Sequence, residues 1–432
     1  MILKSIEITD LTHDGRGVGH QQGKACFVEG ALPGESVSWS MSKSHRQYDE
    51  GVVEEIASAS PDRVDPECQH FGICGGCQIQ HLSYSAQVSA KQNRLKQALQ
   101  HKDIVAENWL DPITAKSWNY RRRARLAVAA PSKRQASNPE MTVGFMQRAS
   151  NQILPVESCP ILVEELNQLL PHLPSLVSSL SNQQRESVTE IELSYHNSHI
   201  SICLIADRKA PATALPRPPP EFLACDIWLK AKGADAVLIY PNNKQPKELQ
   251  PKAPSLKPSA PPGFMQANAE INAAMIEKID QLLQLNDEDK LLDFFCGSGN
   301  LSFPQAQRAK EVIGFEVDQA AVLQARSAQQ PESNISFRSA DLFDADALKQ
   351  LRSVVRKATA VLLDPPRAGA EALMHELVKP KPKQILYVSC HPATFVRDAQ
   401  ILVSKGYRLE SVGLLDMFPQ TMHAEVMGHF RI

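Results

Sequence analysis

The sequence has none of the long hydrophobic segments that a membrane protein needs. No apolar run among its 432 residues reaches the length of a membrane-spanning helix. The first residues, MILKSIEITDLTHDG, include acidic and polar side chains within ten positions, which does not fit a secretory signal. The net charge is only −2 at pH 7, so the total charge gives no indication of a nucleic-acid partner. We therefore expect a cytoplasmic protein without a membrane partner.

The sequence has no internal repeat, and its number of cysteines is odd. The chain has nine cysteines, and a large protein of the cytoplasm is not expected to carry a disulfide framework. Clustered cysteines are then better interpreted as metal ligands or nucleophiles. The chain is too long for one ordinary hydrophobic core, so we expect two or three domains.

Residues 1–58 predict a small β-barrel of the OB-like type. Short alternating runs such as SIEITDL and KACFVEG are separated there by glycine-rich turns. Residues 84–100 have helical spacing, with Val88, Leu95 and Leu99 on one face. The strands and helices expected between residues 100 and 240 indicate an α+β region. The proline-rich stretches 210–220 and 241–263 are poor candidates for core elements, and the second is interpreted as a boundary.

From about residue 264, helical segments alternate with short apolar strands. Strands that are apolar throughout and separated by helices are typical of a doubly wound α/β sheet with both faces covered. The expected strands are KLLDFFCG, EVIGFEVD, ISFRSAD, AVLLDPP and QILYVSC, followed by segments near LESVGLLDMF and EVMGHF.

The stretch LLDFFCGSGNLSF (291–303) is a strand that runs into a glycine turn. Gly297 and Gly299 permit close approach of the backbone to a ligand at the carboxyl end of this strand. The next apolar strand ends in Glu316, which can bind a pair of ribose hydroxyls, and Asp341 ends the third strand. The spacing lacks the full GxGxxG pattern of a dinucleotide site, so we expect a cofactor of the adenosine type. The alternative is a turn with a structural role only.

Two later strands end in residues that can carry chemistry. In VLLDPPRAG (361–369) the expected strand ends in Asp364 and two prolines follow. The residue after the prolines is Arg367, whereas amino-methylating enzymes often have an aromatic residue there. In ILYVSCHPATF (385–395) the expected strand ends in Cys390. Cys390 is either a nucleophile at the cofactor site or a buried structural cysteine, and we expect the second role for Cys203 and Cys225. Glu425, near the end of the chain, is a candidate general base or an ordinary surface group.

Three cysteines with Cys-x5-Cys-x2-Cys spacing lie in the stretch CQHFGICGGCQIQH (68–81). Cys68, Cys74 and Cys77 could form a zinc site that His70 or His81 completes. Soft ligation by thiolates alone would instead suit an iron–sulfur cluster.

Residues 110–150 carry a local charge of +6 that the total charge hides. This region fits an RNA backbone footprint, with Trp118 and Tyr120 available for stacking, or else a solvated strand edge. WNYRRRARLAV (118–128) alternates like a strand, which would point Arg121, Arg123 and Arg125 to one side. The other basic residues are Lys116, Arg122, Lys133, Arg134 and Arg148, and the acids are Asp111 and Glu140.

Together these motifs resemble the RNA uracil-C5 methyltransferases, in particular those that act on bacterial 23S ribosomal RNA. The resemblance covers nearly the whole chain and rests on the following segments in this order: an N-terminal TRAM-like barrel, HFGICGGCQIQH, NYRRRARL, ESCPIL, FMQAN, DFFCGSGN, LLDPPRAG, VSCHPATF and DMFPQTMHAEVM.

The resemblance implies an S-adenosylmethionine-dependent enzyme that methylates a specific uridine of 23S rRNA and acts as a monomer. It implies that Cys390 is the nucleophile and Glu425 the general base. It implies a [4Fe–4S] cluster held by Cys68, Cys74, Cys77 and Cys159. It implies a cofactor pocket lined by Gln266, Phe295, Asn300, Glu316, Asp341 and Asp364.

The resemblance also implies three domains. Residues 1–58 form a TRAM-like barrel that binds RNA. Residues 59–85 and 115–258 form a central domain that carries the iron–sulfur site and the basic strand. Residues 86–114 and 259–432 form a Rossmann-like methyltransferase domain.

The sequence departs from the family pattern at three positions. His391 stands where Asn is usual, Gln420 replaces a common His, and Asp341 replaces a common Asn. Two alternative functions stay open: a uracil-C5 methyltransferase for another rRNA uridine or for tRNA, and an RNA-binding iron–sulfur protein without catalysis.

Overall fold

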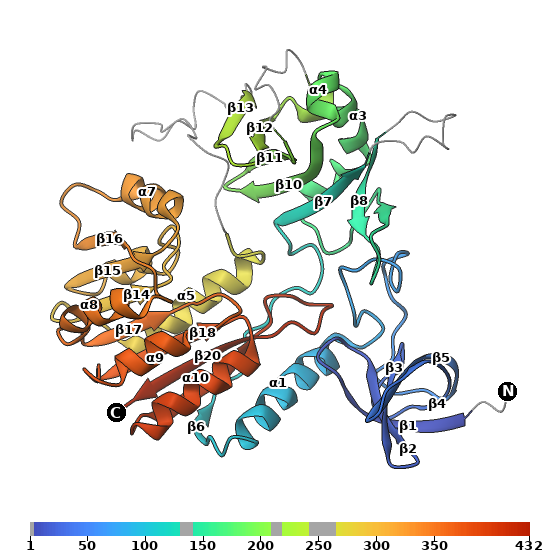
Figure 1. The fold of residues 1–432 in the computed structure, drawn as a ribbon, viewed down its shortest axis with the longest axis horizontal. Coiled ribbons are helices and arrows are strands. Elements are labelled where there is room, and N and C mark those ends of the chain that lie inside the picture. The colour runs from blue at the N-terminus through green and yellow to red at the C-terminus, as the bar shows by residue number, and fades with distance from the viewer. Residues whose placement is uncertain (1–3, 130–140, 209–217, 242–264) are drawn as a thin grey trace. The chain divides into compact units, whose positions relative to one another are not determined.

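The computed structural model describes residues 4–129, 141–208, 218–241 and 265–432. The chain forms two compact units, Met1–Ser83 with Lys116–Gly263 and Tyr84–Ala115 with Phe264–Ile432 (Figure 1). The further division of the first unit into a barrel and a central domain stays a prediction. The boundary expected at 241–263 and most of the stretch 210–220 lie outside the described residues. In the part that is described, no helix has both the length and the apolar character that crossing a bilayer requires.

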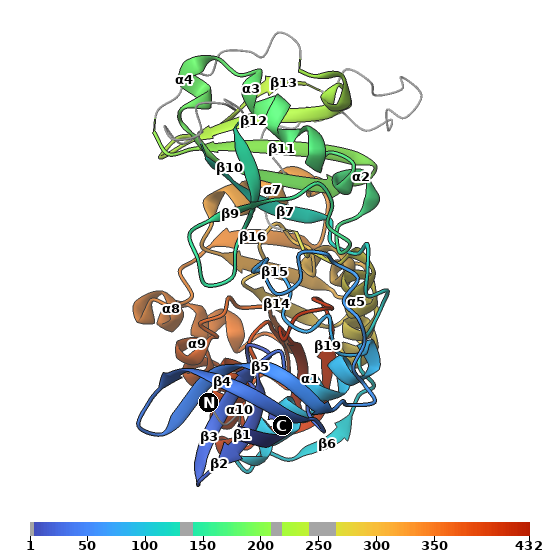
Figure 2. The ribbon, with the colours of Figure 1, turned by 90° about the vertical axis from the view of Figure 1, so that its right-hand side faces the viewer.

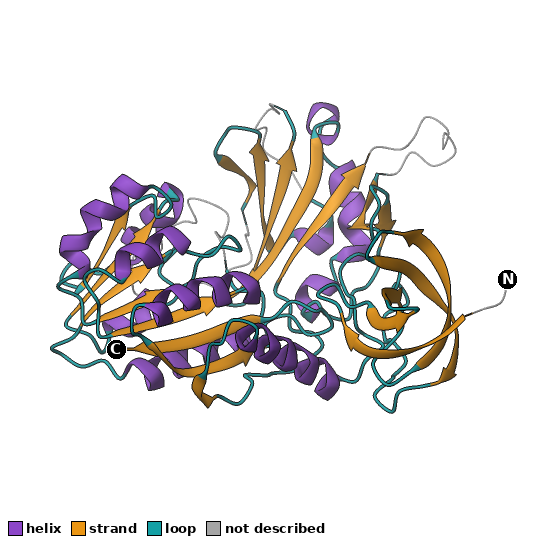
Figure 3. Cartoon of the chain, turned by 60° about the horizontal axis from the view of Figure 1, so that its bottom comes forward, coloured by secondary structure: helices purple, strands orange, loops and turns teal. Residues whose placement is uncertain are grey.

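The first unit begins with a closed barrel of short strands in the order β1-β2-β3-β5-β4, as predicted (Figure 3). Its interior is filled by alternate side chains such as Ile6, Val28 and Val37. The strands are β1 (Lys4–Leu11), β2 (Gly17–Gln21), β3 (Lys24–Glu29), β4 (Ser36–Ser44) and β5 (Tyr48–Ser58).

A buried carboxylate fastens the barrel to the segment that leads into the cysteine loop. Glu35 accepts hydrogen bonds from Arg63 and from the amides of Leu32 and Ser60. Burial would raise the pKa of Glu35, but these donors hold it below its usual value. The start of the cysteine loop is therefore fixed relative to the barrel.

A second, seven-stranded sheet in this unit has the order β13-β12-β11-β10-β7-β8-β9, and its longer strands can be followed in Figure 2. One face of it packs Leu126, Ile191 and Leu204 against Leu166 and Leu173 of short helices. The strands are β7 (Arg123–Ala129), β8 (Thr142–Met146), β9 (Ile153–Pro155), β10 (Val188–His196), β11 (His199–Ala206), β12 (Cys225–Ala231) and β13 (Ala236–Tyr240). The helical segments are α2 (Glu164–Asn167), η1 (Leu170–His172), α3 (Leu173–Ser178), α4 (Asn182–Arg185) and η2 (Pro220–Phe222).

The second unit contains an eight-stranded sheet in the order β16-β15-β14-β17-β18-β20-β19-β6. Neighbouring strands are parallel except that β20 is antiparallel to both β18 and β19. The predicted strands are present as β14 (Lys290–Phe294), β15 (Glu311–Glu316), β16 (Ile335–Ser339), β17 (Ala360–Leu363), β18 (Gln384–Ser389), β19 (Arg408–Leu415) and β20 (Glu425–Arg431). The edge strand β6 (Ala106–Trp109) was not expected, because its sequence AENW is polar and largely exposed.

Helices cover both faces of this sheet, as the doubly wound pattern predicts (Figure 1). Alternate strand residues face opposite sides, so Leu292 and Phe294 pack in one core and Leu291 in the other. One face is covered by α1 (Tyr84–Gln100), α8 (Ala345–Val355), α9 (Glu371–Leu377) and α10 (Pro392–Ser404). The other is covered by α5 (Ala269–Leu283), α6 (Ser302–Ala306) and α7 (Gln319–Ala328).

Candidate functional site

The candidate catalytic site lies along the carboxyl ends of the parallel strands. Because β16, β15, β14, β17 and β18 are neighbours in this order, the residues that follow them form one row. The row contains Asp341, Glu316, the turn 295–300, Asp364 and Cys390. The sheet therefore brings together residues that are far apart in the sequence, at the edge where ligands bind in open α/β sheets.

The turn after β14 requires an unusual backbone. Phe295, Gly297 and Gly299 have φ values of 63°, 54° and 91°. A Cβ on Gly299 would stand 2.6 Å from the ring of Phe303, so only glycine fits there. Phe295 adopts the left-handed region although it carries a bulky side chain, which is a form of strain that clusters at functional sites.

Four of the predicted cofactor residues lie around this turn. Gln266 is buried and donates from Nε2 to Asp364 at 3.4 Å. Asn300 exchanges two hydrogen bonds with Asn272 of α5, at 2.9 and 3.2 Å. Glu316 accepts from the amides of Gly297, Val317 and Asp318, which fixes its carboxylate at the turn.

Asp341 follows β16 and is exposed, and its carboxylate accepts from the amide of Phe343 at 2.9 Å. The exposed ring of Phe343 packs on the ring of Phe295, with centroids 5.7 Å apart. This contact brings the end of β16 near the turn after β14.

Cys390 and Glu425 lie beside each other at the end of two hydrogen-bonded strands. Ser389 of β18 pairs with Val426 of β20, so the residue after β18 is next to the first residue of β20. Burial raises the pKa of Cys390 to about 11, and the carboxyl groups of Glu425 and Asp364 add to this effect while Arg367 opposes it. Asp364 and Arg367 therefore also lie close to the thiol.

Glu425 is buried rather than a surface group, and its Oε2 has no hydrogen-bond partner among the described residues. Burial, followed by the nearby Asp364, raises the pKa of Glu425 to about 8. Burial also raises the pKa of Asp364 to about 7. A carboxyl group with a raised pKa and an unused oxygen has the properties of a proton acceptor that works near neutral pH.

Two of the departures from the family pattern have structural roles. His391 is the N-cap of α10, and its Nδ1 accepts from the amide of Thr394 at 3.4 Å. Gln420 is buried, and its side chain and its amide both bond with Gln87 of α1.

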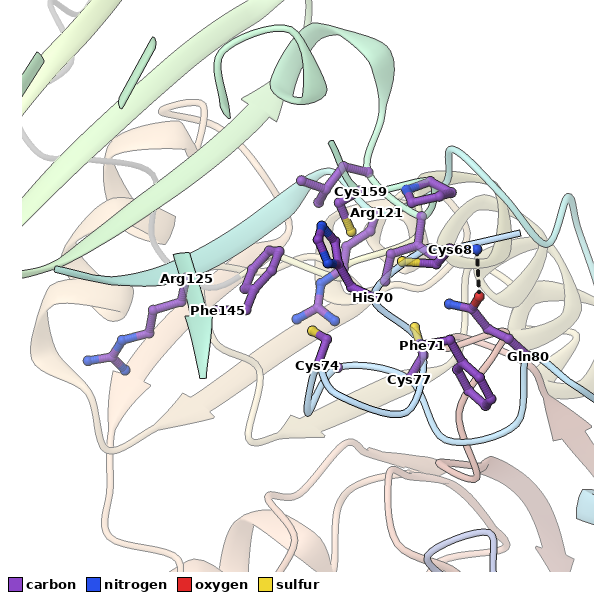
Figure 4. A pocket seen from close by; sticks show the side chains of 14 residues that line it. Cys68, His70, Phe71, Cys74, Cys77, Gln80, Arg121, Arg125, Phe145 and Cys159 are labelled. Atoms are coloured by element: carbon purple, nitrogen blue, oxygen red, sulfur yellow. Dashed lines mark hydrogen bonds between the residues drawn. The ribbon is translucent and has the colours of Figure 1, made fainter. Parts of the chain in front are cut away.

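A separate cavity in the first unit is lined by the four predicted ligand cysteines, Cys68, Cys74, Cys77 and Cys159 (Figure 4). Its volume is about 140 Å³. Burial, together with a smaller effect of the other three thiols, raises the pKa of Cys77 to about 12, as expected of sulfurs that lie close together. Within the ranges that the structure describes, no three His, Cys, Asp or Glu side chains converge on a single point that could hold a metal ion.

The backbone around this cavity holds the cysteines from several directions. Gly75 donates to Met146 and Arg148 donates to Ile73, so the cysteine loop pairs with the turn after β8. The amide of Cys68 donates to Gln80 and the amide of Cys159 donates to Asn167. Of the two candidate histidines, His70 lines the cavity, whereas His81 is buried against Phe71 and is not among the lining residues.

The expected basic strand differs from the prediction. β7 begins at Arg123, and Arg121 precedes it and lines the cysteine cavity. Arg123 pairs with Glu192 at 3.4 Å, and Arg125 pairs with Glu190. The positive charge of this face is thus partly neutralised by β10, a contact that the local charge count could not include.

One of the two expected stacking residues is unavailable. Tyr120 is buried, so it cannot stack on a base, while Trp118 is half-buried. Lys116 is exposed, and Arg148 pairs with Glu29. Lys133, Arg134 and Glu140 lie outside the described residues. Cys203 and Cys225 are buried, as predicted.

The sequence pattern does not identify two residues that act on members of the catalytic row. Asn272 fixes Asn300 but lies on a helix, where an amide carries no recognisable signal. In the sequence, Arg367 differs only by standing where amino-methylating enzymes have an aromatic residue, yet its charge lowers the pKa of Cys390. The position of Arg367 three residues after Asp364, at the same edge as Cys390, could have indicated this.

Comparison with known proteins agrees with this arrangement. A family model described as tRNA (Uracil-5-)-methyltransferase matches residues 83–430, and a TRAM domain model matches residues 4–53. A protein of Hahella chejuensis named 23S rRNA (uracil(1939)-C(5))-methyltransferase RlmD is 37% identical, with 98% of this chain and 96% of that protein covered. A protein of the same name from Pseudomonas putida is 36% identical, with 98% and 93% covered.

Among solved structures, the tRNA (uracil-54, C5)-methyltransferase of Pyrococcus abyssi, in complex with S-adenosyl-L-homocysteine, has a TM-score of 0.70 and 22% identity. The match covers 99% of this chain and all of that one, and it shows a shared fold. The resemblance seen in the motifs is thereby confirmed. The chain belongs to the tRNA (Uracil-5-)-methyltransferase family and carries an N-terminal TRAM domain.

Proposed function

We propose that this protein methylates C5 of a uridine in 23S rRNA and uses S-adenosylmethionine as the methyl donor. The observation that carries the proposal is the adjacent pair of Cys390 and Glu425, at the strand edge where Asp364 also lies. The relatives at 36 and 37% identity are named for uracil 1939, and we propose the equivalent uridine as the target.

The pair can solve the main chemical difficulty of this reaction. Uracil C5 is a weak nucleophile, and addition of the Cys390 thiolate to C6 converts the base into an enolate whose C5 can attack an electrophilic methyl group. The C5 proton must then leave so that the C6–S bond can break and release the enzyme. Glu425 takes this proton, the C5–C6 double bond forms again, and the C6–S bond breaks to release Cys390 as a thiolate.

S-adenosylmethionine supplies the electrophilic methyl group when bound, and its S–CH3 bond breaks so that it leaves as S-adenosylhomocysteine. We assign its site to Gln266, Phe295, Asn300, Glu316, Asp341 and Asp364. Support comes from the row of strand ends and from the buried Asp293. Its Oδ2 accepts a hydrogen bond from Ser302, and in the described part of the chain its Oδ1 has no hydrogen-bond partner. A buried carboxylate oxygen without a donor, next to a strained glycine turn, fits a site for a cationic ligand with hydroxyl groups.

Binding of S-adenosylmethionine should tighten as the pH rises from about 6 to about 8. Asp364 has a pKa of about 7, and the positive sulfonium favours its deprotonated form, so binding releases a proton and strengthens with pH. Calorimetric titration over this range tests the prediction. S-adenosylhomocysteine, which has no sulfonium charge, should show a weaker pH dependence, and Asp364→Asn should reduce the difference. An equal dependence for both compounds would contradict it.

We further propose that the cysteine cavity holds a [4Fe–4S] cluster. Four thiols and no carboxylate are the donor set that such a cluster takes. In a cluster each thiolate binds a different iron, so the sulfurs need not converge on one point as they do around zinc, where they stand about 3.8 Å apart. The cluster would tie the cysteine loop to Cys159 and stabilise the first unit.

Protein purified without oxygen should contain iron and sulfide, and Cys159→Ser should lose most of both. Cys159 lines the cavity together with the three cysteines of the loop, and serine is a much poorer ligand for iron than cysteine. Cys203→Ser is the matched control, because Cys203 is buried elsewhere in the same unit and should keep the iron. Zinc without iron in the unsubstituted protein would refute the cluster.

The barrel does not by itself decide between rRNA and tRNA. The Pyrococcus abyssi protein named for tRNA matches 99% of this chain, so its fold has a counterpart of the barrel. We propose rRNA because the relatives above 35% identity are named for it. The barrel and the exposed basic residues of 110–150 are the proposed RNA contacts, where Lys and Arg would neutralise phosphates.

The test is transfer of labelled methyl groups from S-adenosylmethionine to three RNAs. These are a 23S rRNA fragment containing the target uridine, the same fragment with this uridine replaced, and tRNA transcripts. Label in the first RNA alone supports the proposal, and label in tRNA alone supports the tRNA alternative. Protein that holds iron and binds RNA, but transfers no label, would be a non-catalytic RNA-binding protein.

A further inference from the structure

The segment between β19 and β20 precedes Glu425 in the chain, and polar side chains of α1 form hydrogen bonds with it. This segment, residues 416–424, leads directly into Glu425, the first residue of β20. The helical pattern predicted that α1 buries Val88, Leu95 and Leu99. The structure instead buries Gln87 and Lys91 together with Leu95 and Leu99, while Val88 is half-buried. Two polar side chains on a buried face need partners there.

The partners of both side chains lie in the segment that precedes Glu425. Lys91 Nζ donates to Asp416 Oδ1 at 2.5 Å and to the carbonyl of Phe418 at 3.0 Å, and both charged side chains are fully buried. Gln87 Nε2 donates to Gln420 Oε1, and Gln87 Oε1 accepts from the amide of Gln420, both at 2.9 Å.

The conformation of Gln420 depends on these contacts. Its φ is 69°, in the left-handed region that favours glycine. Such a backbone persists only where the surrounding contacts over-determine it, and Gln87 fixes both the side chain and the amide of this residue. The amide of Asp416 also donates to Ile113, so the start of the segment is held a second time by the chain that follows α1.

We infer that Gln87 and Lys91 are positioning residues for the proton transfer by Glu425, which they control by fixing residues 416–420. This inference rests on the proposed function, because it takes Glu425 as the base. Neither residue touches the reacting atoms. Their role is to hold the loop that sets where the carboxyl group of Glu425 stands relative to uracil C5. We call these contacts of Gln87 and Lys91 with residues 416–420 the clamp. Gln420, which departs from the family pattern, then belongs to the clamp and does not recognise the uracil.

The clamp should act on one step of the reaction. A displacement of about 1 Å at a catalytic group costs on the order of 100-fold in rate. Loss of the clamp should therefore slow removal of the C5 proton, whereas addition of Cys390 and methyl transfer do not require Glu425. RNA that is methylated but still joined to the enzyme should accumulate.

The experiment compares Gln87→Leu with Gln97→Leu in the full-length protein. Gln97 is an exposed residue of the same helix, so it controls for the change of side chain and for helix stability. We expect Gln87→Leu to lower kcat about 10- to 100-fold, with an unchanged KM for S-adenosylmethionine and with adduct on denaturing gels. Gln97→Leu should behave as the unsubstituted protein.

Lys91→Met supplies a second measurement, because it removes the other contact and should give the same adduct. Gln87→Leu protein that is folded and turns over normally, or that turns over slowly without adduct, overturns the inference. Failure of the proposed function itself has a different signature, since the unsubstituted protein would then transfer no methyl group to any RNA.

Discussion

Replacing Cys390 by alanine should abolish methyl transfer, with a loss of turnover on the order of 10⁴-fold or more. Without the thiol, C5 of uracil keeps its weak nucleophilicity, and the remaining groups of the site can only bind and orient the reactants. The structure supports this position for a nucleophile, because Cys390 is partly exposed at the strand edge while Cys203 and Cys225 are buried in the first unit.

Loss of turnover alone would not distinguish a nucleophile from a residue needed for folding, so a second readout is required. With S-adenosylmethionine present, RNA in which the target uridine carries fluorine at C5 should form a permanent adduct with the unsubstituted protein. After methyl transfer C5 carries fluorine in place of the proton, and Glu425 cannot remove fluorine, so the bond from C6 to Cys390 does not break. Cys390→Ala should form no adduct although it binds S-adenosylhomocysteine and RNA normally. An adduct that survives this substitution would assign the nucleophile elsewhere.

The rate of adduct formation should also rise with pH. The pKa of Cys390 is about 11 in the free protein, so only a small fraction is thiolate at neutral pH and this fraction grows with pH. Arg367 opposes the increase in pKa, and Arg367→Gln should therefore shift the profile to higher pH. These profiles are measured by quenching the reaction with fluorinated RNA at early times.

The catalytic row could be predicted from the sequence because parallel strands obey a simple geometric rule. Each strand was recognisable as an apolar run, and the carboxyl ends of such strands meet at one edge. Glu316, Asp364 and Cys390 therefore had to be neighbours of the turn at Gly297, whatever the details of packing. Motif resemblance was needed for Glu425, since a strand near the end of the chain gives no sign that it runs antiparallel beside Cys390.

Polar contacts between distant segments could not be predicted. Lys91 and Asp416 are 325 positions apart, so the sequence does not show that they form a pair. The helical pattern of α1 rests on its apolar residues, and it therefore does not indicate that Lys91 is buried. The same limit applies to Arg123 and Arg125. The local charge count predicts that they contact the RNA backbone. The pairing of β7 with β10, however, places Glu192 and Glu190 next to them. Tyr120 is buried, which its place in a basic stretch of the sequence does not indicate.

Replacing Glu425 by glutamine should lower turnover by about 10²- to 10⁴-fold and trap RNA on the protein. Glutamine has nearly the same shape but cannot accept the C5 proton, so addition of Cys390 and methyl transfer proceed and elimination stops. The trapped species should contain both the labelled methyl group and the RNA. Among the described residues no donor bonds to Oε2 of the buried Glu425, so the substitution breaks no hydrogen bond at that oxygen.

The control for this substitution is a carboxyl group of the same strand pair that lies away from the site. Glu410 of β19 is half-buried and pairs with His429 and Arg431, so Glu410→Gln tests the cost of removing a charge from this part of the sheet. We expect it to turn over normally and to leave no adduct. If Glu425→Gln is folded, binds RNA and yet forms no adduct, then Glu425 acts before methyl transfer, and another group must remove the C5 proton. Asp364 would be the next candidate, because its pKa of about 7 also suits a proton acceptor and its charge reaches Cys390.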